Sequence, residues 1–242
     1  MVRGMDAAID YWEYFRRMAG ILFIISAPSG SGKSTLVAEV RRLVEGLEFS
    51  VSYTTRKLRG SEEPGREYHF TDPATFLEMV NRDEFLEWAE VFGNFYGTGR
   101  GALEHAKQAG KDLLLDIDVQ GAIQVIHRVP EAVSIFVVPP SPEVLERRLR
   151  NRSQAEGVTD EAVIKRRLAQ AKQELLTLRK YKYALINDLL DEAVNELREI
   201  VQFERGEGGK EAATVAQQLR TTVLSPRLKT VLKSFGISDA DL

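Results

Sequence analysis

A continuous apolar run at residues 21–26 leads directly into a loop rich in glycine and serine, and this arrangement restricts the fold more than any other feature. The run has the length and character of a strand that is buried on both faces, as in a parallel sheet. A helical pattern follows the loop from Thr35 to about Val44. A buried strand, a tight loop and a helix in this order predict the first unit of an α/β fold.

The same alternation recurs farther along the chain. Buried apolar runs occur at Asp112–Asp116, Val133–Val138 and Ala184–Ile186. Each is followed by a helical pattern, at Val119–Arg128, Pro142–Arg150 and Leu189–Phe203 respectively. Strands that alternate with helices predict a parallel sheet flanked by helices on both faces.

Two regions interrupt this alternation. Residues 50–100 are polar and rich in glycine and aromatic side chains, which favours a small mixed-β insertion. Residues 147–167 are dense in arginine and have few large apolar groups before Val163, which is typical of a mobile helical lid. We therefore predict an N-terminal extension (1–19), a core (20–49, 101–146 and 168–205), an insertion (50–100), a lid (about 147–167) and a C-terminal extension (206–242).

The two ends of the chain carry weaker patterns. Residues 5–17 could form a short amphipathic helix, or translation could begin naturally at Met18, so that the preceding segment is upstream sequence read in frame. The run Gly206-Glu-Gly-Gly209 is expected to break the last core helix, because glycine is unfavourable in helices. The tail from Lys210 to Leu242 is weakly amphipathic and is expected to dock loosely as one or two short helices.

Composition excludes several classes of protein. The 33 basic and 36 acidic residues give a net charge of −3, which argues against bulk attraction to nucleic acid or an anionic membrane. The chain has no cysteine, so disulfides, Cys-ligated zinc, iron–sulfur clusters and a catalytic thiol are excluded. No apolar stretch approaches membrane-spanning length and the first 20 residues lack a signal-peptide core, so we expect a cytoplasmic protein.

The loop after the first strand matches the P-loop template G-x-x-x-x-G-K-[ST] at every fixed position except the first, where Ala27 replaces glycine. Alanine is tolerated there if its φ is negative. Gly30 and Gly32 allow backbone N–H groups to surround a phosphate, aided by the N-terminus of the following helix. Lys33 would reach the β- and γ-phosphates and Ser34 would join a magnesium shell. The loop therefore predicts a nucleoside triphosphate site.

A P-loop alone does not distinguish a hydrolase, a switch GTPase and a small-molecule kinase. We find no Asn-Lys-x-Asp element of the kind that a switch GTPase uses to read guanine. The arginine-rich segment lies within the same chain, between the predicted strands at 133–138 and 184–186, so it could close over the phosphates in cis. This arrangement favours phosphoryl transfer between two bound small molecules, in a site from which a lid excludes water.

Several motifs together resemble the guanylate kinases. They are Ser-Ala-Pro-Ser-Gly-Ser-Gly-Lys-Ser at 26–34, Ser-Tyr-Thr-Thr-Arg-Lys-Leu-Arg at 52–59, Gly-Arg-Glu-Tyr-His-Phe at 65–70, Glu-Trp-Ala-Glu-Val-Phe-Gly-Asn-Phe-Tyr-Gly-Thr at 87–98 and Leu-Asp-Ile-Asp-Val-Gln-Gly at 115–121. The resemblance runs from about Gly20 to Arg205, with Phe95 where tyrosine is frequent. It implies a P-loop nucleoside monophosphate kinase fold and the reaction MgATP + GMP → ADP + GDP, with dGMP also an acceptor.

The resemblance also implies residue roles on the acceptor side. Arg56, Arg59, Tyr68 and Tyr96 correspond to residues that hold the phosphate of GMP. Residues implied to contact the guanine are Ser52, Glu87, Thr98 and Asp118, with Glu62 as a further acid of the acceptor site. A carboxylate such as Glu87 can accept from the N1 and N2 donors by which guanine differs from adenine.

On the donor side, the resemblance implies that ATP is bound by the P-loop and by one later asparagine. These residues are Ala27, Pro28, Ser29, Gly30, Ser31, Gly32, Lys33, Ser34, Thr35 and Asn187. Asp116 and Ser34 resemble the residues that order Mg²⁺ in this family. Arg148, Arg152 and Arg167 resemble the lid arginines that neutralise the transferring phosphoryl group. The choice between these and their neighbours, Arg147, Arg150 and Arg166, stays open.

Two alternatives are weighed against a catalytic GMP kinase. A kinase of a phosphorylated ribose would keep the P-loop but not the guanine-reading set, and a non-catalytic binding module would not need Lys33, Ser34 and the lid arginines. The expected partners are therefore ATP and GMP, with no nucleic acid and no membrane, for a monomer or weak homo-oligomer. Residues 1–17 and 207–242 are expected to be dispensable for the chemistry.

Overall fold

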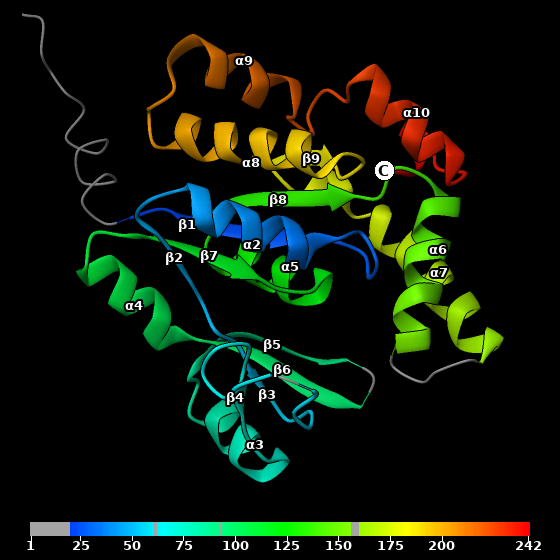
Figure 1. Cartoon of the computed structure of the whole chain (residues 1–242). Coiled ribbons are helices and arrows are strands. Elements are labelled where there is room, and N and C mark those ends of the chain that lie inside the picture. Colours follow the sequence, from blue (N-terminus) through cyan, green and yellow to red (C-terminus); the bar gives the residue numbers. More distant parts are fainter. Residues whose placement is uncertain (1–19, 61, 92, 156–159) are drawn as a thin grey trace, which may run out of the picture.

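The computed structural model describes residues 20–60, 62–91, 93–155 and 160–242. The expectations for residues 1–19 and for positions 156–159 of the lid lie outside the described residues. Figure 1 shows a central sheet covered by helices on both faces, with a smaller sheet beneath it and a pair of helices at one side. This is the α/β architecture that the sequence predicts, with its mixed-β insertion.

The central sheet has five parallel strands. Their order is β2 (Leu47–Phe49), β7 (Asp112–Asp116), β1 (Leu22–Ser26), β8 (Val133–Val138) and β9 (Tyr183–Ile186). Four of these strands are the predicted apolar runs, to within one residue at either end, whereas the three-residue edge strand β2 was not predicted. Every residue of β1, β8 and β9 is buried, as expected for strands with helices on both faces.

Helices cover the two faces of this sheet according to the alternation of its side chains. Phe23 and Ile25 of β1 point to the face covered by α2 (Lys33–Leu43) and α8 (Leu190–Glu204). Leu22 and Ile24 point to the opposite face. The elements on that face are α4 (Arg100–Gln108), α5 (Val119–Arg128), the end of α7 (Glu161–Leu175) and α10 (Pro226–Ser234). The sheet therefore lies between two separate apolar clusters.

The insertion is a four-stranded mixed sheet backed by one helix. Its strands are ordered β4 (His69–Phe70), β3 (Tyr53–Thr54), β6 (Asn94–Gly99) and β5 (Phe85–Val91). The pair β3–β4 is parallel and the other two pairs are antiparallel. Helix α3 (Pro73–Asn81) was not predicted; it begins at an Asp72 cap and buries Phe76 and Met79 against the sheet.

The segment predicted to be a lid consists of α6 (Pro142–Ala155) and the first part of α7. The two helices pack on each other through Leu145, Leu149 and Ala171, with Leu168 at the edge of this cluster. We call these four side chains the lid-root cluster. The boundaries expected at residues 147 and 167 fall inside continuous helices, so the segment predicted to be a lid continues two helices that begin or end in the core.

The C-terminal tail packs more closely than the sequence suggests. Helix α9 (Gly209–Gln218) lies on α8, and α10 follows it. Four tail side chains are buried in the same cluster as β1 and β7, namely Leu224, Leu228, Leu232 and Ile237. The expectation of loose docking is therefore wrong. The apolar side chains of the tail are spaced so that they pack into the same apolar cluster as β1 and β7.

The tail also runs beside the edge strand β9. The amide of Ala184 donates to the carbonyl of Leu219 at 2.9 Å, and the amide of Thr221 donates to the carbonyl of Lys182 at 3.3 Å. Tyr183 and Arg220 form an isolated antiparallel bridge between these hydrogen bonds. This edge of the sheet is therefore covered by the chain itself.

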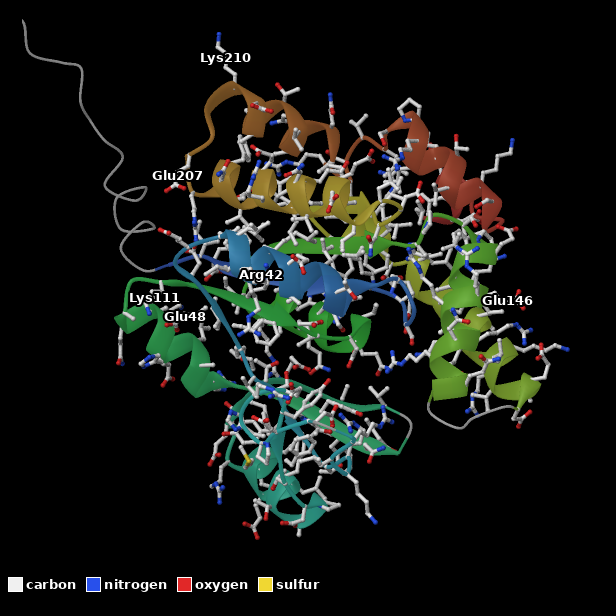
Figure 2. All side chains as sticks on the ribbon, viewed as in Figure 1. Arg42, Glu48, Lys111, Glu146, Glu207 and Lys210 are labelled. Atoms are coloured by element: carbon white, nitrogen blue, oxygen red, sulfur yellow. The ribbon has the colours of Figure 1, made fainter. Side chains whose placement is uncertain are left out.

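Charged side chains lie on the outside of this framework. Glu48 on β2 and Lys111 before β7 point toward each other and form an ion pair at 2.7 Å (Figure 2). None of the helices in the described part of the chain is both long and apolar enough to cross a membrane.

Candidate active site

The P-loop connects β1 to α2. Ser31 donates its amide to the carbonyl of Pro28 at 3.1 Å, and Gly30 and Gly32 adopt φ angles of +89° and +83°. Only glycine adopts such angles readily. Among the described residues other than glycine, Asp83 is the only one with positive φ, so Ala27 has the negative φ that its replacement of glycine requires.

Two later segments hold the P-loop in place. Asn187, at the end of β9, donates its side-chain amide to the carbonyl of Ser31 at 2.8 Å. Arg148 on α6 donates to the same carbonyl at 3.3 Å and to the carbonyl of Asn187 at 3.2 Å. A Cβ on Gly32 would lie 2.5 Å from the amide nitrogen of Asn187, so glycine is also required there for space.

A cleft of about 440 Å³ opens over this loop, and we call it the P-loop cleft. It is lined by every residue from Ala27 to Thr35, by Arg148, Arg152 and Asn187, and by Asp188 and Leu190, which the sequence did not single out. The structure therefore brings together the whole predicted ATP-binding set.

Lys33 connects the loop to the neighbouring strand. Its ammonium donates to the carboxylate of Asp116, at the end of β7, and to the carbonyl of Ile117 at 2.8 Å. Both charged side chains are largely buried, with 17% and 16% of their surfaces exposed. A charge in such surroundings is stable only with a partner. The pair thus places one positive and one negative group at the floor of the site.

A second cleft, of about 290 Å³, lies between the central sheet and the insertion, and we call it the central cleft. Five residues line both clefts, namely Ala27, Ser29, Lys33, Ser34 and Arg152. The predicted residues that line the central cleft alone are Ser52, Arg59, Tyr68, Glu87, Tyr96, Asp116, Asp118 and Arg167. The two clefts therefore meet at the end of the P-loop.

Glu87 on β5 is the most deeply buried acid of the central cleft, with 3% of its surface exposed. Thr98 on β6 donates its hydroxyl to Oε1 of Glu87 at 2.6 Å. A side chain at Gly121, in the first turn of α5, would collide with the same carboxylate. Burial raises the pKa of Glu87 to about 7, and the nearby Asp118 adds to this effect. Thr98 does not line the cleft but orients the acid that does.

Arg56 and Glu62 also lie behind the wall of the cleft. The guanidinium donates to both carboxylate oxygens of Glu62, at 3.0 and 2.8 Å. These hydrogen bonds lower the pKa of Glu62. Arg56 also lies over the rings of Tyr68 and Phe70, at 5.3 and 5.8 Å from their centroids. In this structure Glu62 neutralises Arg56, and neither residue lines the cleft.

Asp118, like Glu62, accepts hydrogen bonds from residues close to it in the sequence. Its carboxylate accepts from the amides of Gln120 and Gly121 at 2.7 and 2.9 Å and so caps α5. The residue still lines the central cleft. An N-cap of this kind is recognisable in sequence as an acid before a helical pattern, and the cap accounts for its place independently of any ligand.

Two residues of the central cleft, Gln170 and Glu174, were not predicted from the sequence. They line the cleft from α7 together with the predicted Arg167, because residues spaced by three and four positions share one face of a helix. Gln170 donates to Glu174 at 2.9 Å, and burial raises the pKa of Glu174 to about 7. Arg167 also donates to the hydroxyl of Ser153 on α6 at 3.0 Å. The sequence shows this spacing, but it does not show that this face of the helix points into the cleft.

Two adjoining clefts, one over a P-loop and one beneath a small mixed sheet, define a P-loop protein with the architecture of nucleoside monophosphate kinases. Comparison with known proteins identifies the family within this class. A family model described as "Guanylate kinase" matches residues 20–204. The chain belongs to the guanylate kinase family.

Individual relatives agree with this assignment. A guanylate kinase of Koribacter versatilis is 54% identical over 188 residues, which cover 78% of this chain and 80% of the relative. One from Vibrio cholerae is 45% identical over 202 residues, covering 83% and 96%. The crystal structure of guanylate kinase from Anaplasma phagocytophilum is 34% identical, with a TM-score of 0.64, and covers 78% of this chain and 88% of that one.

Proposed function

We propose that this chain is an ATP:GMP phosphotransferase, which converts MgATP and GMP, or dGMP, into ADP and the nucleoside diphosphate. One observation carries the proposal: the P-loop cleft and the central cleft share Lys33, Ser34 and Arg152. Two nucleotides that occupy the two clefts would meet with their phosphates at these residues. Transfer then requires mainly positioning and neutralisation of charge, without a covalent enzyme intermediate.

ATP would occupy the P-loop cleft. Backbone amides around Gly30 and Gly32 and the N-terminus of α2 would face the phosphates, and Lys33 would supply a positive charge. Asn187 already holds the loop through Ser31, so its proposed contact with the adenine side would come from the same fixed position. Binding of the triphosphate would draw Lys33 from Asp116 toward the β- and γ-phosphates.

The residues at the floor suit a magnesium ion that arrives with the nucleotide. Ser34 and Asp116 offer hard oxygen donors at the junction of the clefts. In the described ranges no group of three or more acidic or histidine side chains could hold a metal ion. Bound magnesium would neutralise phosphate charge, and departure of Lys33 would release the Asp116 carboxylate for it.

The guanine of GMP would lie against Glu87. One oxygen of this acid accepts from Thr98, and a carboxylate retains capacity for the two donors that guanine presents. Ser52 and Asp118 line the same cleft and are proposed to contact the base. An adenine would present an acceptor at the corresponding ring nitrogen, next to a carboxylate that offers no proton when ionised.

The phosphate of GMP would be held by Arg59, Tyr68 and Tyr96, which line the central cleft. Arg56 is proposed to join them, since it lies beside Tyr68. Glu62 is then an indirect contributor that fixes the guanidinium. A pairing of this kind keeps the fork of the arginine oriented before the ligand arrives.

Arg148, Arg152 and Arg167 are proposed to neutralise the transferring phosphoryl group. Arg148 and Arg152 are four residues apart on α6 and line the P-loop cleft, and Arg167 on α7 lines the central cleft together with Arg152. Closure of the lid, residues 147–167, and of the insertion, residues 50–100, over the core would exclude water. Arg150 lines neither cleft and is paired with Glu146 and Glu161.

We further propose that the enzyme acts in the cytoplasm on free nucleotides, as a monomer or weak homo-oligomer. The net charge of −3 supports the absence of bulk binding to nucleic acid or anionic membranes. This part of the proposal follows from the sequence.

The proposal is tested by supplying MgATP with GMP, dGMP, AMP, CMP or UMP and measuring formation of ADP and of each diphosphate. We expect GMP to be preferred over AMP, CMP and UMP by at least about 100-fold in kcat/KM, because an unmatched buried polar group costs about 1–3 kcal/mol and several would be mismatched. Equal use of AMP and GMP would overturn the assignment of the central cleft.

A further inference from the structure

The end of helix α10 is built to present one aromatic side chain. Phe235 is the C-cap, and Gly236 follows with φ of +68°. The amide of Ile237 donates to Leu232 at 3.0 Å and that of Gly236 to Lys233 at 2.9 Å. These two hydrogen bonds form a Schellman motif, which stops the helix at a defined residue and fixes the direction of the chain beyond it.

Phe235 packs against the lid-root cluster as well as against the central core. Gly236 approaches the same helices, because a Cβ there would lie 3.3 Å from Nζ of Lys172 on α7. Figure 1 shows the end of α10 beside the upper ends of α6 and α7. The tail therefore touches both lid helices at the point where they leave the core.

The lid-root cluster also touches the P-loop. A Cβ on Gly30 would lie 3.0 Å from Leu145 and 3.1 Å from Leu149, so these leucines lie directly on the glycine. Arg148 lies between them in the sequence of α6 and donates to the carbonyl of Ser31. Phe235 is thus separated from the phosphate-binding loop by one layer of side chains.

We propose that Phe235 is a positioning residue for phosphoryl transfer: it wedges the roots of α6 and α7 and so sets where the lid arginines stand over the P-loop. The proposal rests on the proposed function. The family match ends at residue 204, so this contact belongs to a segment outside it. It replaces the expectation that residues 207–242 are dispensable for the chemistry.

A small rotation at the root of α6 produces a larger displacement farther along the helix. Arg152 lies seven residues beyond Leu145 on α6, a distance of about 10 Å along the helix. A tilt of about 10° at the root would therefore move the guanidinium by about 2 Å. Displacements of about 1 Å can lower the rate of an enzyme by as much as 100-fold. The residues proposed to contact the guanine, Ser52, Glu87 and Asp118, lie outside both lid helices, so GMP affinity should depend on Phe235 less than kcat does.

The test compares three variants of the full chain. Phe235→Ala removes the wedge, and Phe235→Leu keeps an apolar side chain in contact with the lid-root cluster. Val231→Ala is the matched control, because Val231 is partly buried on the same helix and packs against the central core but not against the lid roots. Each is assayed for kcat and for both KM values well below its melting temperature.

We expect Phe235→Ala to lower kcat about 5- to 20-fold with KM for GMP changed less than about twofold, because the residues proposed to contact the guanine lie outside the displaced lid helices. Phe235→Leu should restore kcat to within about twofold of the parent, and Val231→Ala should leave it unchanged. An unchanged kcat in Phe235→Ala, or an equal loss in Val231→Ala, would overturn the proposal. Absence of GMP kinase activity in the parent chain would instead remove the proposed function.

A double-mutant cycle gives a second measurement. Leu168 is a partly buried member of the lid-root cluster next to Arg167. If Phe235 acts through that cluster, Phe235→Ala and Leu168→Ala should be non-additive in kcat, with the double variant losing no more than about twofold beyond the worse single variant. Additive losses would contradict the proposal. Should Phe235→Ala fail to fold, Phe235→Val takes its place in both tests, with an expected loss of about two- to fivefold.

Discussion

Glu87 and Thr98 face each other across the β5–β6 pair, and the threonine hydroxyl holds the buried carboxylate at 2.6 Å. Gly121 leaves room for the other oxygen of the same group. A carboxylate buried in this way has few alternatives for orientation, so its acceptor oxygens are fixed before any ligand binds. The predictions for base selection follow from this pair.

Glu87→Gln should raise KM for GMP about 10- to 100-fold, because an amide donor then opposes a donor of guanine and one buried mispairing costs about 1–3 kcal/mol. KM for ATP should change less than about twofold. Steady-state kinetics with each nucleotide varied in turn measures both values. Glu90→Gln is the control, since Glu90 lies exposed on the same strand. Equal losses for both nucleotides would exclude Glu87 from the guanine site.

The affinity for GMP should depend on pH through the same acid. Burial raises the pKa of Glu87 to about 7, and only the ionised form accepts from both guanine donors. kcat/KM for GMP should therefore fall as the pH drops below 7, by up to about tenfold per unit, and level off above about pH 8. The GMP phosphate also titrates, with a pKa near 6. If kcat/KM of the Glu87→Gln variant still falls below pH 7, that decrease comes from the titration of another group.

Lys33→Ala should lower kcat by at least about 1,000-fold while the chain stays folded, because the lost charge acts most strongly as phosphate charge shifts in the transition state. Removal of Lys33 also leaves Asp116 without its partner, so a modest loss of thermal stability should accompany it. Lys107→Ala, on the exposed face of α4, is the control. A folded Lys33→Ala protein with near-normal GDP formation would refute the P-loop assignment.

Glu174→Gln should stabilise the nucleotide-free protein at neutral pH and above. Burial raises the pKa of Glu174 to about 7, so the folded parent loses stability as the pH rises from 4.5 through 7, whereas the amide has no charge to bury. The gain should reach about 2 kcal/mol above pH 7 and vanish near pH 4.5, after allowance for partial exposure. Denaturant unfolding at several pH values measures it. Exposed Glu131→Gln should show no such trend.

The elements that the sequence predicts well are those with a strong local signal. β1, β7 and β8 are continuous apolar runs, and each is buried because helices cover both faces of the sheet. The P-loop follows from its own spacing of glycine, lysine and serine. By contrast β3 and β4 have two residues each, too few for any periodicity, and their pairing depends on contacts across the insertion.

The parts of the site that the sequence could not predict depend on partners that are distant along the chain or on the direction of a helix. Arg56 and Glu62 looked like two independent ligand contacts, and only the fold reveals that one holds the other. Glu174 shares a helix face with Arg167, but that face could have pointed to solvent. The tail was expected to dock loosely because its amphipathic pattern is weak, and that pattern does not show which face of the core its apolar side chains meet.

The segment that runs beside β9 has a consequence for the protein in solution at high concentration. An uncovered edge strand offers a row of amides and carbonyls on which a second chain can add a strand. Here the backbone of residues 219–221 occupies that row at Lys182 and Ala184, while the other edge strand, β2, has only three residues. The tail thus protects this edge from pairing with another chain, and its removal would expose backbone groups at which aggregation can begin.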